Sequence, residues 1–215
     1  MGIRRGPNII REGLVFQIDP SSPRSYPGSG TTMYDLGSQK TNAGLVNSPT
    51  FNSSTPKSFT MDGINDYIET PNMSVTSTRT VEVTYRLVTT GQSWGPLWRS
   101  DWRERIFPST LVVVNANGTY YYLNAPIDNT NITTVSYSYS GTSLKAYRDG
   151  ELTDSQTMDG AMDSSTYSYT FGYQCGGSSC LFSNVEIYSV RMYNRQLTNS
   201  EILQNYNMTK SRFGK

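Results

Sequence analysis

Three carboxylates crowd around a glycine in the stretch "MDGINDYIE" (61–69). They belong to Asp62, Asp66 and Glu69. On a helix they would share one face and could hold a metal ion or transfer a proton. A helix is disfavoured here, because Gly63 and the β-branched and aromatic residues after it are poor helix formers. Ile64 stands where an EF-hand loop needs its second oxygen ligand. The stretch therefore predicts strand, turn and strand, with Asx side chains fixing the turn.

All tryptophans of the chain fall in one segment, "SWGPLWRSDWRERIF" (93–107). They are Trp94, Trp98 and Trp102. Exposed indole rings stack on sugar rings, and neighbouring charged groups such as Asp101 and Arg103 can bond sugar hydroxyls. Trp and Arg are equally enriched in protein interfaces, and one or two of these tryptophans could belong to the core. A carbohydrate site and an interface or core segment are therefore both open.

The two cysteines, Cys175 and Cys180, lie in the loop-like stretch "YQCGGSSCLF". A structural zinc site needs about four good ligands, and the chain offers two thiols and no histidine. A disulfide and a pair of free thiols are the two alternatives. We expect no metal and no cofactor.

Charge and composition limit the classes of partner. The formal net charge is +1, charged residues make up 16% of the chain, and no basic run occurs, so we expect no nucleic-acid partner. Apolar runs are short, so we expect no membrane span. The first residues, "MGIRRGPNIIREG", lack the apolar core of a secretory signal, so we expect no export signal.

Alternating residues predict the elements that must position these groups. In "TRTVEVTYRLV" (78–88) apolar residues alternate with polar ones from Thr80 to Leu87, which indicates a strand with one buried face. Further strands are predicted at 13–19, 57–61, 66–70, 109–116, 119–125, 133–139, 143–149, 166–173 and 184–193. Asp149-Gly150 predicts a tight hairpin. About ten short strands indicate a sandwich or barrel. The predicted core includes Phe59, Met61, Val81, Val83, Tyr85 and Val190.

One helix is predicted near Asn199–Tyr206, in "LTNSEILQNY". Thr198 can cap it and Glu201 can complete a capping box. Leu197 and Ile202 have the spacing of a hydrophobic staple. We expect this short helix to close one end of the sandwich.

Three segments resemble LamG-like, concanavalin A-like jelly-roll domains of tailed-bacteriophage structural proteins. They are residues 13–51, "SFTMDGINDYIE" (58–69) and "VEIYSVRMYNRQLTNSEILQNYN" (185–207), and "LKAYRDGEL" (144–152) resembles the family's hairpin. In a departure from the family, "MYDLGSQK" (33–40) replaces a tryptophan and an Asn-rich run. The resemblance implies an all-β, antiparallel two-sheet jelly-roll sandwich with one short C-terminal helix over residues 13–215, after an extended arm at 1–12.

The resemblance implies no reaction, because this fold carries lectins, glycosidases and structural modules. Without histidine, Ser-His-Asp and Cys-His arrangements are excluded. Related glucanases carry an E-x-D-x-x-E strand, and the nearest match, "RSDWRE" (99–104), has Arg99 in place of the first glutamate. Asp101 and Glu104 then lack the nucleophile. We predict no catalytic residues and no enzyme.

We predict instead a virion structural protein of a tailed bacteriophage, as capsid decoration, head fibre or tail accessory. It would lie on the outer surface of the particle, and in the host cytoplasm during assembly. It would contact other virion proteins, in many copies or as a homo-oligomer. The alternative is an adhesin module that binds host surface glycans. A host-encoded lectin-like domain is a third and weaker reading.

The N-terminal arm combines Ile9 and Ile10 with Arg4 and Arg5. Apolar residues flanked by arginines suit an arm that docks on a larger protein and orders on contact. Alternatively, Ile9 and Ile10 add an edge to the domain's own sheet.

Overall fold

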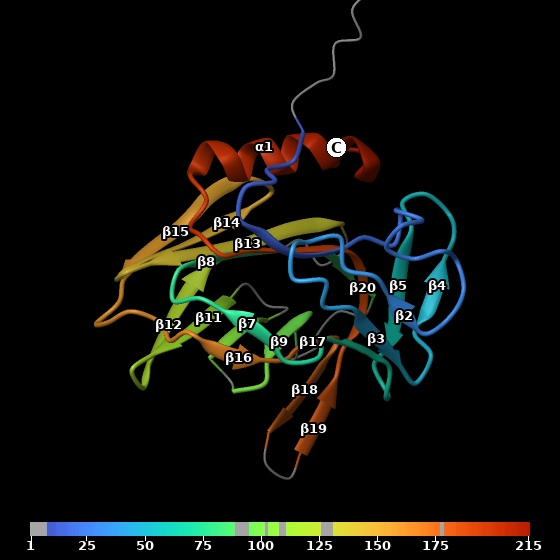
Figure 1. The fold of residues 1–215 in the computed structure, drawn as a ribbon, viewed down its shortest axis with the longest axis horizontal. Coiled ribbons are helices and arrows are strands. Elements are labelled where there is room, and N and C mark those ends of the chain that lie inside the picture. Colours follow the sequence, from blue (N-terminus) through green and yellow to red (C-terminus); the bar gives the residue numbers. More distant parts are fainter. Residues whose placement is uncertain (1–7, 89–94, 102, 108–110, 126–130, 177–178) are drawn as a thin grey trace, which may run out of the picture.

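The computed structural model describes residues 8–88, 95–101, 103–107, 111–125, 131–176 and 179–215. Within these residues two antiparallel sheets pack face to face around a hydrophobic core, and a C-terminal helix lies on one of them (Figure 1). The predicted all-β sandwich is confirmed. The part of the chain that the structure describes contains no helix with the length and apolar character needed to cross a bilayer.

The first sheet, sheet A, carries the longest strands. Its members are β1 (Leu14–Ile18), β4 (Thr50–Asn52), β5 (Ser58–Asp62), β8 (Arg79–Leu87), β13 (Thr133–Ser140), β14 (Ser143–Arg148), β15 (Glu151–Thr157) and β20 (Asn184–Tyr193). Their order is β15-β14-β13-β8-β20-β5-β4. β20 is long enough to pair with β5 along its first half and with β1 along its second.

The second sheet, sheet B, is built from shorter strands. They are β2 (Thr32–Met33), β3 (Ala43–Val46), β6 (Tyr67–Glu69), β9 (Leu97–Arg99), β10 (Glu104–Ile106), β11 (Leu111–Ala116), β12 (Thr119–Asn124) and β17 (Tyr169–Phe171). The order is β12-β11-β10-β9-β17-β6-β3-β2. Two small pairs flank the sandwich: β7 (Met73–Val75) with β16 (Ser165–Tyr167), and the hairpin of β18 (Tyr173–Gly176) and β19 (Ser179–Phe182).

The core forms where the alternating residues of both sheets meet. All six predicted core residues are at most 1% exposed: Phe59, Met61, Val81, Val83, Tyr85 and Val190. Full burial of one such side chain contributes roughly 1.5–3 kcal/mol. The predicted single strand 166–173 is wrong, because Ser168 and Gly172 divide it among β16, β17 and β18. β16 pairs with β7 at the edge, whereas β17 enters sheet B between β6 and β9.

The acidic stretch 61–69 is strand, turn and strand, as predicted: it holds the end of β5, a turn at 63–66 and β6. The side chain of Asp62 accepts hydrogen bonds from the backbone N–H groups of Ile64 and Asn65, at 2.7 and 3.2 Å. Slight burial opposes the charge, but these donors lower the pKa of Asp62 overall. Gly63 has a φ of 77°, which explains why glycine stands there. The carboxylate therefore holds the turn.

The helix α1 (Asn199–Thr209) and the 3₁₀ turn η1 (Lys210–Phe213) cover the outer face of sheet A (Figure 1). The prediction that the helix closes one end of the sandwich is therefore wrong, because its apolar side chains pack on the face of the sheet. The capping box of Thr198 and Glu201 is present, as predicted. Asp149 and Gly150 both have positive φ, which confirms the tight hairpin between β14 and β15.

Residues 8–12 lie against this helix. Ile9 and Ile10 pack on the cluster formed by Leu14, Tyr147, Tyr193, Leu197 and Ile202. The backbone N–H of Ile10 donates to Asn205 Oδ1 at 2.8 Å, and the Tyr193 hydroxyl donates to the Ile10 carbonyl at 3.2 Å. These contacts hold this part of the arm on the domain without adding it to a sheet. Arg4 and Arg5 lie outside the described residues, so the docking role of the arm stays a prediction.

Candidate functional site

The tryptophan segment folds into β9, a turn and β10, which place alternate residues on opposite sides of sheet B. Leu97 and Ile106 point into the core, so Arg99 and Glu104, two residues away on their strands, also face inward. Trp98 and Arg105 are directly paired across the two strands and face outward. One short segment thus supplies an inner and an outer cluster.

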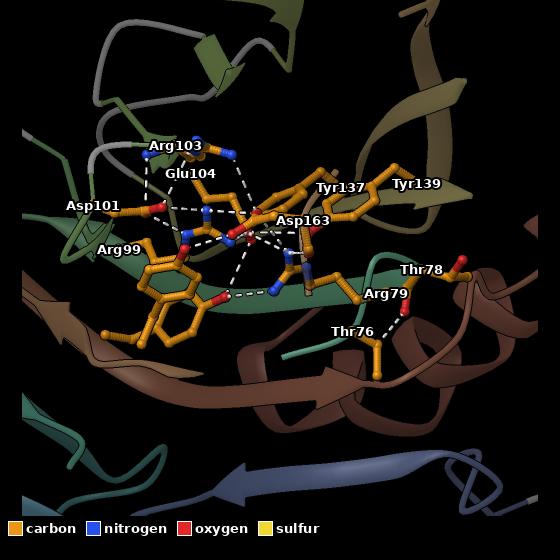
Figure 2. Close-up of polar contacts among 12 residues, drawn as sticks. Thr76, Thr78, Arg79, Arg99, Asp101, Arg103, Glu104, Tyr137, Tyr139 and Asp163 are labelled. Carbon is orange, nitrogen blue, oxygen red and sulfur yellow. Dashed lines mark hydrogen bonds and ion pairs between the residues drawn. The ribbon is translucent and has the colours of Figure 1, made fainter. Parts of the chain in front are cut away.

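The inner cluster centres on the carboxylate of Glu104, which is fully buried. Arg99 Nη1 donates to it at 2.6 Å, and Arg79 Nη2 lies 3.3 Å from it (Figure 2). Three tyrosine hydroxyls donate to the same group: Tyr137 at 2.7 Å, Tyr139 at 3.1 Å and Tyr169 at 3.3 Å. Burial, together with the charge of Glu104, raises the pKa of Tyr137 and of Tyr169. These phenols therefore stay protonated and act as donors.

Arg99 connects this buried centre to the rim of the sandwich. Its Nη2 donates to Asp101 at 2.6 Å and to Asp163 at 3.1 Å (Figure 2). Burial opposes ionisation of Arg99, but Glu104 and Asp101 raise its pKa overall. Burial alone would raise the pKa of Asp163, but the hydrogen bond from Tyr167 and the charge of Arg99 lower this pKa overall. At the rim, Arg103 Nε lies 3.5 Å from Asp101 Oδ2.

The inner cluster has the geometry of a structural network. A glycosidase needs one carboxyl group that gives a proton and one that attacks, both open to the sugar. Here Glu104 is fully buried, and Asp101 and Asp163 each form an ion pair with Arg99. Among the described residues, no group of three or more His, Cys, Asp or Glu side chains is arranged to hold a metal ion.

The outer cluster presents rings and one arginine. The Arg105 guanidinium lies over three rings, at 5.1 Å from Trp98, 5.6 Å from Phe107 and 5.0 Å from Tyr120. Trp98 is only 4% exposed, whereas Tyr120 and Tyr122 are 44% and 55% exposed. Among these described rings, those of Tyr120 and Tyr122 are the open ones, and Trp98 supports Arg105.

The strand pairing extends this cluster into a row across the outer face of sheet B. From β12 to β2 the directly paired residues are Tyr122, Val113, Arg105, Trp98, Thr170, Glu69, Gly44 and Thr32. No described helix lies on this face, whereas α1 covers sheet A (Figure 1). We call these residues the outer row.

A polar groove of about 440 Å³ lies at the end of the outer row near β3 and β6. Asn42, Glu69, Asn72 and Ser168 line it around Gly44. A Cβ atom at Gly44 would meet nothing nearer than a backbone oxygen at 4.0 Å. The missing side chain therefore leaves the groove open between two amides and a carboxylate.

An aromatic stack stands beside this end of the sheet. The rings of Tyr67 and Tyr173 are stacked at 4.5 Å, and Phe182 lies 4.9 Å from Tyr173. Tyr173 and Phe182 belong to the β18–β19 hairpin, in which a disulfide joins Cys175 to Cys180. The disulfide alternative is therefore the one that the structure contains.

The structure places the described residues of the predicted tryptophan site in two different positions. Trp98 lies in the outer row, and Asp101 and Arg103 lie at the rim. Trp94 and Trp102 lie outside the described residues, so their role stays a prediction. Sequence reasoning missed the groove and gave Tyr120 and Tyr122 no role. Alternation in "TYYYLNA" could have placed these two tyrosines on one face.

Comparisons with known proteins agree on the fold. No protein-family model matches the chain, and no curated protein matches its sequence. Domain 4 of AbnA, an extracellular GH43 arabinanase from Geobacillus stearothermophilus, solved with arabinotriose, has a TM-score of 0.71 at 13% identity, over 92% of this chain and 100% of that domain.

The binding domain of botulinum neurotoxin DC, solved with rat synaptotagmin II, has a TM-score of 0.69 at 10% identity, over 91% of this chain and 51% of that one. The binding domain of Paraclostridial Mosquitocidal Protein 1 has a TM-score of 0.67 at 13% identity, over 91% of this chain and 52% of that one. The chain therefore spans about half of these two binding domains. It has the antiparallel β-sandwich fold that they and the arabinanase domain contain.

Proposed function

We propose that the chain is a non-catalytic carbohydrate-binding module that holds an oligosaccharide along the outer row of sheet B. The observation that carries this proposal is the row itself, which runs from an exposed tyrosine through Arg105 to a polar groove. Sugar-binding surfaces combine aromatic faces with a few placed polar groups.

Each part of the row has a distinct task. Tyr120 and Tyr122 offer exposed rings on which a sugar ring can stack. Arg105 donates to ring or hydroxyl oxygens. Glu69 and Asn42 at the groove accept from and donate to hydroxyl groups. The row crosses eight paired strands, each about 4.8 Å from the next, so it suits a chain of several sugars better than a single one.

Two solved structures support this choice of ligand. The arabinanase domain, whose whole length is covered by the match to this chain, is described with arabinotriose. The botulinum neurotoxin DC binding domain, of which this chain matches half, is described with SialylT. Both ligands belong to those proteins. For this chain they select oligosaccharides as the first compounds to test.

The test is a glycan array followed by calorimetric titration of arabinotriose and of the strongest array ligand. We expect Tyr122→Ala and Glu69→Gln to weaken binding about tenfold or more. Leu203→Ala is the matched control, because Leu203 is 41% exposed on the opposite, helical face. Absence of binding to every glycan at millimolar concentration, or an equal loss in the control, would contradict the proposal.

A role on the outer surface of a phage particle is the second proposal. It rests on the resemblance of residues 58–69 and 185–207 to domains of phage structural proteins. The rings and arginine of the outer row would equally suit a protein partner. Mass spectrometry of purified particles tests the location. If the polypeptide is missing from mature particles, the virion role is wrong, whereas the carbohydrate proposal stands or falls on the titration.

A further inference from the structure

A second arginine cluster lies on the covered face of sheet A, between the sheet and α1. Gln17, Arg191 and Glu82 are directly paired neighbours on β1, β20 and β8. Arg191 Nε lies 3.2 Å from a Glu82 oxygen. Asn205 of α1 donates to the same carboxylate at 2.9 Å. The helix therefore closes over a row of buried polar groups.

Two side chains of this row have buried atoms that are left unpaired. The side chains of Arg191 and Gln17 are 2% and 8% exposed. Arg191 Nη2 and Gln17 Oε1 are nevertheless without a hydrogen-bond partner among the described residues. A buried donor or acceptor left unpaired is costly, and such groups are normally satisfied. An unpaired donor, on Arg191, and an unpaired acceptor, on Gln17, thus lie on adjacent strands.

Both side chains line a cavity of about 240 Å³. Its other charged walls are Arg11 from the arm, Arg212 from η1 and Asp19. Arg212 donates to both oxygens of Asp19, at 2.8 and 2.9 Å, so that pair is satisfied within the wall. Glu82 balances Arg191 and Asp19 balances Arg212, so Arg11 leaves the lining with one excess positive charge, which favours an anion. The volume lies below the range of drug-sized sites, so the ligand is small.

We propose that this cavity binds a small hydroxylated oxyanion, with a carboxylate or phosphate group against Arg191 and a hydroxyl group against Gln17. Arg191 would donate its free N–H to the oxyanion, and Gln17 would accept from the hydroxyl. Arg11 would add its charge at the entrance. The bound anion would connect residues 8–11, β1, β20 and the end of α1. This site is separate from the outer row and does not depend on the carbohydrate proposal.

Calorimetric titration at constant ionic strength tests this site with three compounds. Sodium phosphate and galacturonate carry both the anion and hydroxyl groups, whereas galactose carries hydroxyl groups alone. We expect saturable binding of at least one anion and none, or much weaker binding, of galactose. Phosphate alone, or galacturonate alone, would identify which oxyanion fits. No binding of either anion, or equal binding of galactose, would overturn the proposal.

Variants then locate the binding. Gln17→Glu places a carboxylate of the same shape beside Arg191, where it would take the position of the anion. We expect it to abolish binding while the melting temperature stays the same or rises. Arg11→Gln, at an exposed position, should weaken binding several-fold, and Arg24→Gln, exposed and outside the cavity, should have no effect. Unchanged affinity in Gln17→Glu would place the anion elsewhere and overturn the proposal.

Discussion

The two sides of β9 and β10 each carry an arginine, and the two arginines serve different purposes. On the inner side, the Arg99 guanidinium is surrounded by the carboxylates of Asp101, Glu104 and Asp163. On the outer side, Arg105 lies over aromatic rings and is partly exposed. An arginine whose charges are matched within the protein stabilises the fold, whereas one that faces rings and solvent is free to meet a ligand.

The largest effect is expected on the inner side. Glu104→Gln removes the charge that Arg79 and Arg99 share, which leaves buried cations incompletely paired. We expect a loss of about 3–5 kcal/mol in the free energy of unfolding. Urea denaturation measures this loss. The matched control is Glu69→Gln on the outer face, which we expect to change stability by about 0.5 kcal/mol or less. Equal losses in both variants would remove the distinction between the two sides.

A smaller loss is expected when one donor to Glu104 is deleted. Tyr169→Phe removes a hydroxyl that donates to the carboxylate at 3.3 Å and keeps the buried ring. We expect a loss of roughly 1–3 kcal/mol in the same denaturation experiment, because the acceptor is charged and buried. Tyr122→Phe, on the exposed outer face, is the control and should be neutral. A neutral Tyr169→Phe would show that the other donors suffice.

On the outer side, Arg105→Ala should separate binding from stability. Stacking of a partly exposed arginine on rings is worth about 1 kcal/mol or less, so the unfolding free energy should change by no more than that. Oligosaccharide affinity, measured by calorimetry, should fall about tenfold or more because a charged hydrogen bond is lost. A large loss of stability with unchanged affinity would assign Arg105 to the fold.

The smallest effect concerns an ion pair at the surface. Arg195 donates to Glu201 at the start of α1, and this bond, against slight burial, lowers the pKa of Glu201 to about 2. The folded pKa lies below the ordinary value of 4.5, so the stabilisation is present above pH 4.5 and is lost as the pH falls toward 2. Because the pair lies at the surface and is partly exposed, it is worth about 1 kcal/mol or less.

Denaturation at a series of pH values measures this contribution. At pH 7 the Glu201→Gln variant should have a lower free energy of unfolding than the unmodified protein. This difference between the two proteins should shrink as the pH falls to 2. A constant difference at all pH values would mean that the charge of Glu201 is not responsible.

The long regular elements could be predicted from the sequence because their signals are local. Apolar and polar residues alternate in β8 from Thr80 to Leu87, and α1 carries its own capping box. β9 and β10 are three residues each, and the inward-facing Arg99 and Glu104 break the apolar alternation that marks a strand. Their partners explain why charged residues face the core there.

The candidate site depends on contacts between distant parts of the chain. Trp98 pairs with Thr170, and Glu69 pairs with Gly44, so the outer row exists only after the strands have taken their order. The sequence placed Trp98 in a candidate binding segment but could not show that Arg105 lies over its ring. The cavity beside Arg191 joins residue 11 to residue 212 and is likewise invisible in any local pattern.

The central claim is that the outer face of sheet B binds an oligosaccharide, and a two-dimensional NMR titration of the ¹⁵N-labelled protein tests it most directly. With arabinotriose or the best array ligand, we predict chemical-shift changes at Arg105, Thr170, Glu69 and Gly44 and at the indole N–H of Trp98. Signals from α1 should stay in place. A titration that reaches saturation with changes confined to α1 and residues 8–12, or a spectrum that does not change at all, would contradict the account.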